Sequence, residues 1–237
     1  MAAGSFLNVC MDRLPEEQSI IKPPSHCPVC NRKLGPLDLV PVLSYLWLRG
    51  RCRYCRAPIP VRLSAVEMVT GLLFAFLYLR FGITMELGVY IVFTSLLIVI
   101  FVTDLEHQLV LDKITFPGMG FALLAALLLP GPGILKVLLG GGIGLAAMAL
   151  PFLVYRRGMG LGDVKLGALI GLMTGYPVVI TALLMAVISG GLFAAFLLIF
   201  KISRRDDAVP FATFLTTATV VSLFWGQEIW RWYLNLY

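Results

Sequence analysis

The chain has 237 residues, of which 59% are hydrophobic and only 14% are charged. A soluble domain carries about 25% charged residues. Here the shortfall is concentrated in long uncharged runs, which excludes an ordinary soluble fold and indicates a polytopic membrane protein. The net charge of +6 is compatible with nucleic-acid binding, but nine of the 19 Lys and Arg residues lie between residues 11 and 62 and the others mainly in short loops. That distribution is typical of cytoplasmic loops, so we expect contact with membrane lipid and none with nucleic acid.

The N-terminal segment, residues 1–63, contains the only substantial polar region of the chain. Eight prolines between residues 15 and 60 exclude long helices there. Cys27, Cys30, Cys52 and Cys55 form two Cys-x-x-Cys pairs separated by 21 residues, and four thiolates so spaced can close a tetrahedral, structural zinc site. Two local disulfides or free thiols are the alternatives, and His26 is a possible substitute ligand. Zinc would fold this loop-rich segment, which is too short to bury much core.

Residues 64–237 form the second predicted domain, a bundle of membrane-spanning helices. The candidate spans are residues 64–81, 87–103, 114–130, 137–155 and 208–227. The uncharged run 166–200 is too long for one helix, and Gly175-Tyr176-Pro177 is a turn signal within it. We therefore predict a short span followed by a full one, which gives an all-α protein with about seven transmembrane helices.

The topology follows from the distribution of positive charge. With the cysteine module on the cytoplasmic side, sixteen Lys and Arg residues lie inside and three lie outside. This bias is strong, because cytoplasmic loops are enriched in Lys and Arg. It places the ends of two predicted spans, near Asp104 and Asp163, on the cytoplasmic face.

Asp104 and Asp163 are the two carboxylates that bear most on function. Asp104 follows the uncharged run 87–103, and Asp163 ends the glycine-rich sequence Gly158-Met159-Gly160-Leu161-Gly162-Asp163. If they meet at one membrane depth, the pair shares a proton, so that one member can activate water while the other polarises a carbonyl. The alternatives are that both residues only mark the ends of spans, that Asp163 is a helix N-cap, or that the pair relays protons in a transporter.

These motifs together resemble the type IV prepilin leader peptidase family of Gly-x-Gly-Asp intramembrane aspartic proteases. The matching segments, in family order, are Gly4-Ser5-Phe6-Leu7-Asn8-Val9, Arg13-Leu14-Pro15, Cys27-Pro28-Val29-Cys30, Asp38 to Tyr45, Arg49 to Cys55, Glu67 with Thr70-Gly71, Asp104 to Val110, and Gly160 to Leu166. The resemblance implies that Asp104 and Asp163 are the catalytic aspartates. Pro210-Phe211-Ala212-Thr213-Phe214 only loosely resembles the corresponding family segment, and we assign it no function from the sequence.

The resemblance also implies a substrate and a second activity. The family removes the basic leader of type IV prepilin or pseudopilin precursors at the bacterial cytoplasmic (inner) membrane. Members with the cysteine module commonly also methylate the new N-terminus with S-adenosylmethionine. Glu67, an acid within an apolar span, is a candidate for holding an amine or the cofactor. A peptidase without methylation and a non-enzymatic zinc-knuckle membrane adaptor remain alternatives.

The start of the chain departs from the family pattern. Only three residues precede Gly4, whereas family members usually begin with a complete membrane span. The expectation is therefore either a longer native N-terminus or a member that has lost most of this first span.

Overall fold

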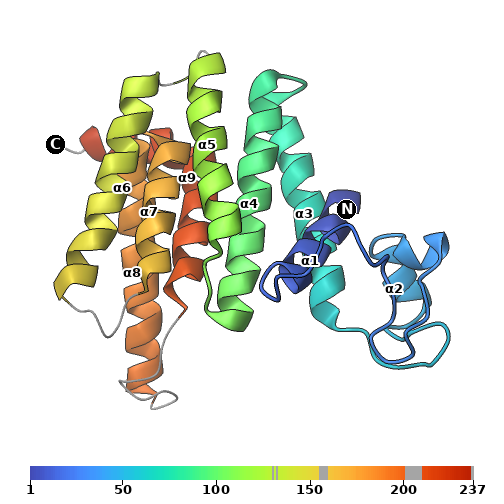
Figure 1. Ribbon diagram of the computed structural model, residues 1–237. Helices are drawn as coiled ribbons and strands as arrows, with labels where there is room; N and C mark the ends of the chain where they lie inside the picture. Colours follow the sequence, from blue (N-terminus) through green and yellow to red (C-terminus); the bar gives the residue numbers. More distant parts are fainter. Residues whose placement is uncertain (130, 132, 155–159, 201–209, 236–237) are drawn as a thin grey trace. The chain divides into compact units, whose positions relative to one another are not determined.

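The computed structural model describes residues 1–129, 131, 133–154, 160–200 and 210–235, and within these residues the regular secondary structure is helical apart from two isolated β-bridges. The elements are α1 (Ala2–Arg13), the 3-10 helix η1 (Pro36–Leu39), α2 (Leu43–Trp47), α3 (Val61–Phe81), α4 (Met85–His107), α5 (Asp112–Leu128), α6 (Ile134–Val154), α7 (Leu161–Thr174), α8 (Val178–Ile199) and α9 (Phe211–Leu234) (Figure 1). The all-helical prediction is confirmed. The chain divides into two compact units, residues 1–99 and 100–237, and the predicted functional boundary after residue 63 stays a prediction.

In the first unit, α1 packs closely against the start of α3. A Cβ added to Gly4 would lie 2.8 Å from the backbone of Glu67, so only glycine permits this approach. Nearby, the Asn8 side chain donates a hydrogen bond from Nδ2 to the carbonyl oxygen of Leu63 (2.9 Å), and Arg62 pairs with Asp12. The chain that connects α1 to α3, residues 14–60, is the cysteine module.

The module contains two similar knuckles, each built on one Cys-x-x-Cys pair. In the first, the Cys27 N–H donates to the carbonyl oxygen of Arg32 (3.0 Å), and in the second the Cys52 N–H donates to that of Ala57 (2.8 Å). Each turn is completed by a residue with positive φ directly after its second cysteine, Asn31 in one and Arg56 in the other. Both cysteine pairs therefore lie in the same kind of tight turn.

In the second unit, α7 is the central helix and packs against α5, α6, α8 and α9 (Figure 1). Its contact with α6 is a seam of glycines spaced four residues apart on each helix. A Cβ added to Gly144 would lie 2.1 Å from the oxygen of Gly167, and one added to Gly171 would lie 2.0 Å from the oxygen of Gly140. Small residues at this spacing let membrane helices approach backbone to backbone.

The helices correspond to all the predicted spans, including the break in the long uncharged run. This run divides as expected, because α7 ends at Thr174 and α8 begins at Val178. Among the described residues, four helices are long and apolar enough to cross a membrane, namely α3, α4, α6 and α8.

The predicted count of about seven spans is not confirmed, and the reason differs between helices. With 17 and 14 residues, α5 and α7 fall short of the ~20 that a span requires. The 24-residue α9 is long enough, but it carries several threonines together with Gln227 and Glu228. Part of the predicted charge bias rests on Arg156, Arg157, Lys201, Arg204 and Arg205, which lie outside the described residues.

Candidate functional site

Asp104 and Asp163 come from different helices of the second unit and lie within electrostatic range of each other. Asp104 is in the last turn of α4 and is only 5% exposed. Asp163 is the third residue of α7 and is half-buried. The charge of Asp104 acts directly on Asp163. Two carboxylates within a few ångströms of each other share a proton, and this is the arrangement predicted for the pair. The arrangement has the chemical character expected of an aspartate dyad, and their catalytic roles stay predictions.

A backbone donor that sequence reasoning missed lies against Asp104. The N–H of Thr213 donates a buried hydrogen bond to Asp104 Oδ2 (2.8 Å). Thr213 is the third residue of α9, so its N–H is one of the four at a helix start that have no partner within the helix. The positive end of the helix dipole therefore points at this carboxylate. The predicted span 208–227 and Pro210, directly before α9, indicated a helix here, but neither indicated that its first turn meets Asp104.

A glycine allows the chain after Asp104 to pack on the turn before Asp163. The loop between α4 and α5 begins at Gln108, which has positive φ and donates its N–H to the carbonyl oxygen of Asp104 (2.9 Å). Further along the loop, Val110 lies against Gly162, where an added Cβ would come within 2.9 Å of the Val110 Cβ. Gly162 is therefore required for the close approach of the two segments that carry the aspartates.

An ion pair fixes the first turn of α7 to the start of α5. The Lys165 Nζ donates to both carboxylate oxygens of Asp112, at 2.7 and 2.8 Å, and it also lies 5.4 Å from the centre of the Phe116 ring. Lys165 is two residues from Asp163, so this pair restrains the part of α7 that presents the carboxylate. The pair is partly exposed and by itself adds little to stability.

The four predicted metal ligands come together in the module. The Sγ atoms of Cys27, Cys30, Cys52 and Cys55 all lie within 4.8 Å of one another, and those of Cys27 and Cys55 are 3.7 Å apart. Tetrahedral zinc with Zn–S bonds of ~2.3 Å requires sulfur atoms ~3.8 Å apart. All four thiols are free, so the disulfide alternative is not realised and the cluster can bind a metal such as zinc.

At Cys27 the knuckle backbone favours the thiolate that a metal needs, whereas burial and the neighbouring thiols raise the pKa of Cys55 to about 11. Hydrogen bonds from the backbone of Cys30 and Val29 lower the pKa of the Cys27 thiol to about 6. His26 is not part of the cluster of mutually close donors; its ring lies 3.1 Å from the carbonyl oxygen of Pro24. Four sulfurs complete a structural site and leave no position open for water.

Glu67 lies outside the aspartate pair and has a backbone partner in the module. Its Oε2 accepts a hydrogen bond from the N–H of Val42 (2.8 Å). Val42 has positive φ, an unusual conformation for a β-branched residue, and it directly precedes α2. The contact therefore attaches the module to α3. The predicted role of Glu67 toward an amine or cofactor stays a prediction.

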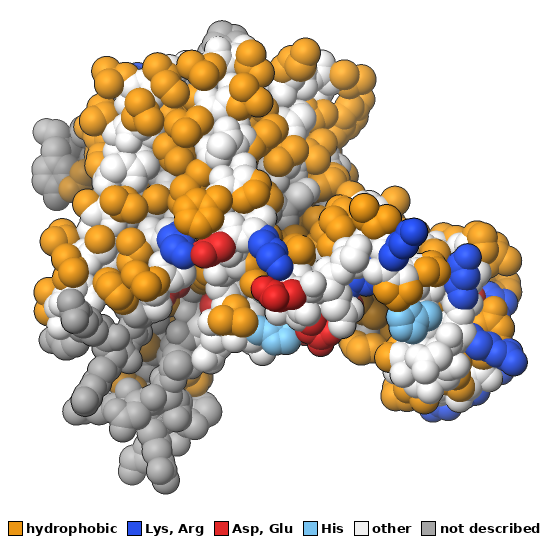
Figure 2. All heavy atoms as spheres, viewed as in Figure 1, with side chains coloured by type: hydrophobic (Ala, Val, Ile, Leu, Met, Phe, Trp, Pro, Cys, Tyr) orange, Lys and Arg blue, Asp and Glu red, His pale blue; other side chains and the backbone are white. Residues whose placement is uncertain are grey.

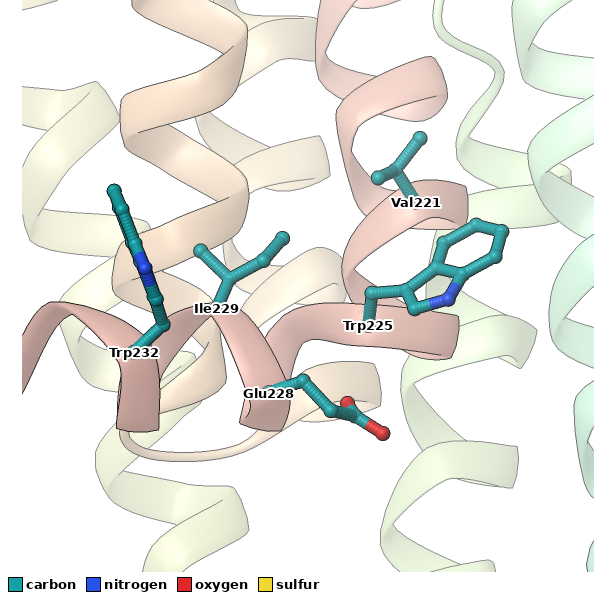
Figure 3. Close-up of a pocket in the computed structure, with 5 residues that line it drawn as sticks. All are labelled: Val221, Trp225, Glu228, Ile229 and Trp232. Carbon is teal, nitrogen blue, oxygen red and sulfur yellow. The ribbon is translucent and has the colours of Figure 1, made fainter.

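None of these groups lines the hollow in Figure 3. It lies on the C-terminal half of α9 and is lined by Val221, Trp225, Glu228, Ile229 and Trp232. Neither aspartate of the dyad lines it. Trp225 and Trp232 are exposed, as expected of aromatic residues that anchor a helix at a membrane interface.

Comparisons with known proteins match both the N-terminal part of the chain, which contains the cysteine module, and the part that carries the two aspartates. A model of the bacterial peptidase A24 N-terminal domain matches residues 1–81, and a model of the type IV leader peptidase family matches residues 91–195. The prepilin leader peptidase/N-methyltransferase of Bacillus subtilis (strain 168) is 35% identical over 234 residues, covering 98% of this chain and 94% of the relative. The protein of that name from Aeromonas hydrophila is 31% identical, covering 98% and 90%. No solved structure matches.

Proposed function

Because the chain belongs to the type IV leader peptidase family, we propose that it is a membrane aspartic endopeptidase that removes the leader of type IV prepilin or pseudopilin precursors. Its relatives carry prepilin leader peptidase/N-methyltransferase as their name, which supports both cleavage and N-methylation. The observation that carries the proposal is the placement of Asp104 in the last turn of α4 and Asp163 in the first turn of α7, where Val110, which follows Asp104, packs on Gly162, directly before Asp163.

In this mechanism the two aspartates divide the acid and base roles. A carboxylate accepts the N–H of Thr213 more strongly than a neutral carboxyl does, so we assign the ionised form to Asp104. Asp104 then takes a proton from the attacking water, while the protonated Asp163 donates a hydrogen bond to the scissile carbonyl oxygen. Breakdown of the tetrahedral intermediate returns a proton to the leaving amine.

The membrane placement follows from helix composition and charge. Four apolar helices and the named relatives support a multi-pass protein of the bacterial inner membrane. We propose that the module and the aspartates face the cytoplasm, because Lys and Arg are enriched in the module and in cytoplasmic loops generally. A basic prepilin leader would then meet the dyad on the side where the precursor is made.

The cysteine module and Glu67 belong to the second activity in this proposal. Zinc held by the four cysteines would supply structure only, because the sulfurs would fill its coordination. When bound, S-adenosylmethionine would supply the methyl group for the new N-terminal amine. Glu67, fixed beside the module by Val42, is the candidate acid for holding that amine or the cofactor.

The test is cleavage of a prepilin in vesicles by the wild type, Asp104→Asn and Asp163→Asn. Loss of a general base or acid lowers the rate by about 10²–10⁴-fold, so both variants should lose cleavage while their expression and zinc content stay unchanged. Glu106→Gln is the matched control, because Glu106 is an exposed acid in the same turn of α4 as Asp104. Cleavage that persists in either dyad variant would remove the protease mechanism and favour the adaptor. The mass of the mature N-terminus separates a bifunctional enzyme from a peptidase alone.

A further inference from the structure

A group of large apolar side chains is exposed on the otherwise polar cysteine module. Leu37, Val40, Leu43 and Trp47 line one shallow hollow, and we call these four residues the α2 face. Trp47 is 86% exposed, Leu37 72% and Leu43 65%. In Figure 2, hydrophobic side chains lie beside Lys and Arg on this module. A contiguous apolar patch of this kind on a polar surface marks a contact with a protein or a membrane.

The attachment of the module to α3 indicates how deep in the membrane the α2 face lies. Val42, which directly precedes α2, is hydrogen-bonded to Glu67, the seventh residue of α3. Glu67 is therefore ~9 Å along the helix from Val61, at ~1.5 Å per residue. The 21 residues of α3 give ~31 Å, just enough to cross the ~30 Å hydrocarbon core. If α3 spans the core from end to end, Glu67 and the start of α2 lie below the membrane surface, within the ~5–10 Å at which interfacial apolar segments are buried.

The charge around the α2 face matches a membrane surface. Residues 18–60 contain seven Lys and Arg residues and one acid, Asp38, which is paired with Arg53 (2.6 Å). Arg49, Arg51 and Arg56 follow α2 closely and are exposed. Basic residues next to an interfacial apolar face bind anionic headgroups, and Trp prefers the boundary between headgroups and acyl chains.

We propose that the α2 face is buried in the headgroup and upper acyl-chain region of the leaflet at which α3 begins, with Arg49, Arg51 and Arg56 on anionic headgroups. The cysteine cluster is then held against the membrane surface and does not project freely into water. This inference rests on the first unit alone and does not depend on any catalytic activity of the chain.

Trp47 provides a direct test in the full-length protein. The chain has four tryptophans, so changing Trp225, Trp230 and Trp232 to Phe leaves Trp47 as the only one. This variant is placed in vesicles that contain phosphatidylglycerol and phosphatidylcholine brominated at defined acyl positions. Zinc content and elution volume confirm that it folds as the wild type does. A further Trp47→Phe change removes the last tryptophan and gives the background emission. Adding Leu72→Trp to this tryptophan-free variant places a reference probe at an exposed position midway along α3, near the centre of the bilayer.

We expect Trp47 to lose most of its emission when bromine lies near the glycerol end of the acyl chain, and less when it lies near the methyl end. Leu72→Trp should show the opposite order. Added iodide should quench Trp47 weakly. Strong quenching by iodide without quenching by brominated lipid would show a water-exposed face and overturn the proposal. Protection from both quenchers would also overturn it, because a protein partner or a second copy would then cover the face.

Discussion

The hydrogen bond from the Thr213 N–H to Asp104 leads to the sharpest prediction about the dyad. Thr213→Pro removes this donor, and because the first four N–H groups of a helix have no partner within it, proline breaks no bond inside α9. A hydrogen bond to a charged, buried group contributes ~1.5–3 kcal/mol. If the hydrogen bond contributes this energy while the Asp104 carboxylate acts as base, its loss in Thr213→Pro lowers kcat/KM for prepilin cleavage about 10- to 100-fold.

Thr213→Ala is the matched control, because it keeps the N–H. It removes only the hydroxyl, which donates to the carbonyl oxygen of Pro210 (2.6 Å), and a methyl group. The assay is cleavage of a purified prepilin in detergent, measured as a function of pH. In Thr213→Pro the acid limb of the profile should move to higher pH, since loss of the donor disfavours the ionised carboxylate. In Thr213→Ala the limb should stay where the wild type has it.

Two results would refute this reasoning. Equal kcat/KM values for Thr213→Pro and Thr213→Ala would show that the N–H does not support catalysis. A loss of activity in Thr213→Pro with an unshifted pH profile would indicate a misplaced helix. An ester analogue at residue 213, which replaces the N–H with oxygen without a ring, should reproduce the shift if the donor is responsible.

Three further predictions concern the packing and the metal. Gly144→Ala brings a Cβ to 2.1 Å from a backbone oxygen of α7, so it should lower stability by about 1–3 kcal/mol in thermal unfolding. Gly142→Ala on the same helix, with nothing within 4 Å of the added atom, should be neutral or stabilising. Gly162→Ala, with its clash at 2.9 Å, should lower cleavage more than Gly160→Ala, whose added Cβ meets nothing closer than 3.8 Å; equal losses would contradict the packing argument. Cys30→Ser should release most of the bound zinc, measured by metal analysis of the purified chain, whereas unchanged zinc content would exclude the four-sulfur site.

The features predicted correctly from sequence are those that depend on side-chain type and spacing. Cys-x-x-Cys pairs can be recognised because a tight turn brings residues i and i+3 together, whatever the rest of the fold does. The split of the run 166–200 followed from Gly175-Tyr176-Pro177, since this tripeptide interrupts a helix. Asp104 and Asp163 both lie at helix ends, as expected from their place beside uncharged runs, and their meeting as a catalytic pair stays a prediction.

The features that sequence reasoning missed are made by the backbone. Every residue except proline has an N–H, so nothing in the identity of Thr213 indicates that this N–H meets a carboxylate. The same is true of Val42, whose N–H binds Glu67. The span count was not confirmed because composition alone treated α5, α7 and α9 as equivalent to the longer, more apolar helices. Their short length or threonine content instead suits helices that pack mainly against protein.

The shortness of α7 has a consequence for the chemistry. Its 14 residues give ~21 Å, against ~30 Å of hydrocarbon, so at least one end of α7 must lie inside the thickness of the bilayer. Leu166, Leu169 and Ile170 are fully buried, and the glycine seam presses α7 against α6. Protein therefore replaces lipid around most of α7. A carboxylate on its first turn, half-buried as Asp163 is, can then lie below the membrane surface without facing acyl chains.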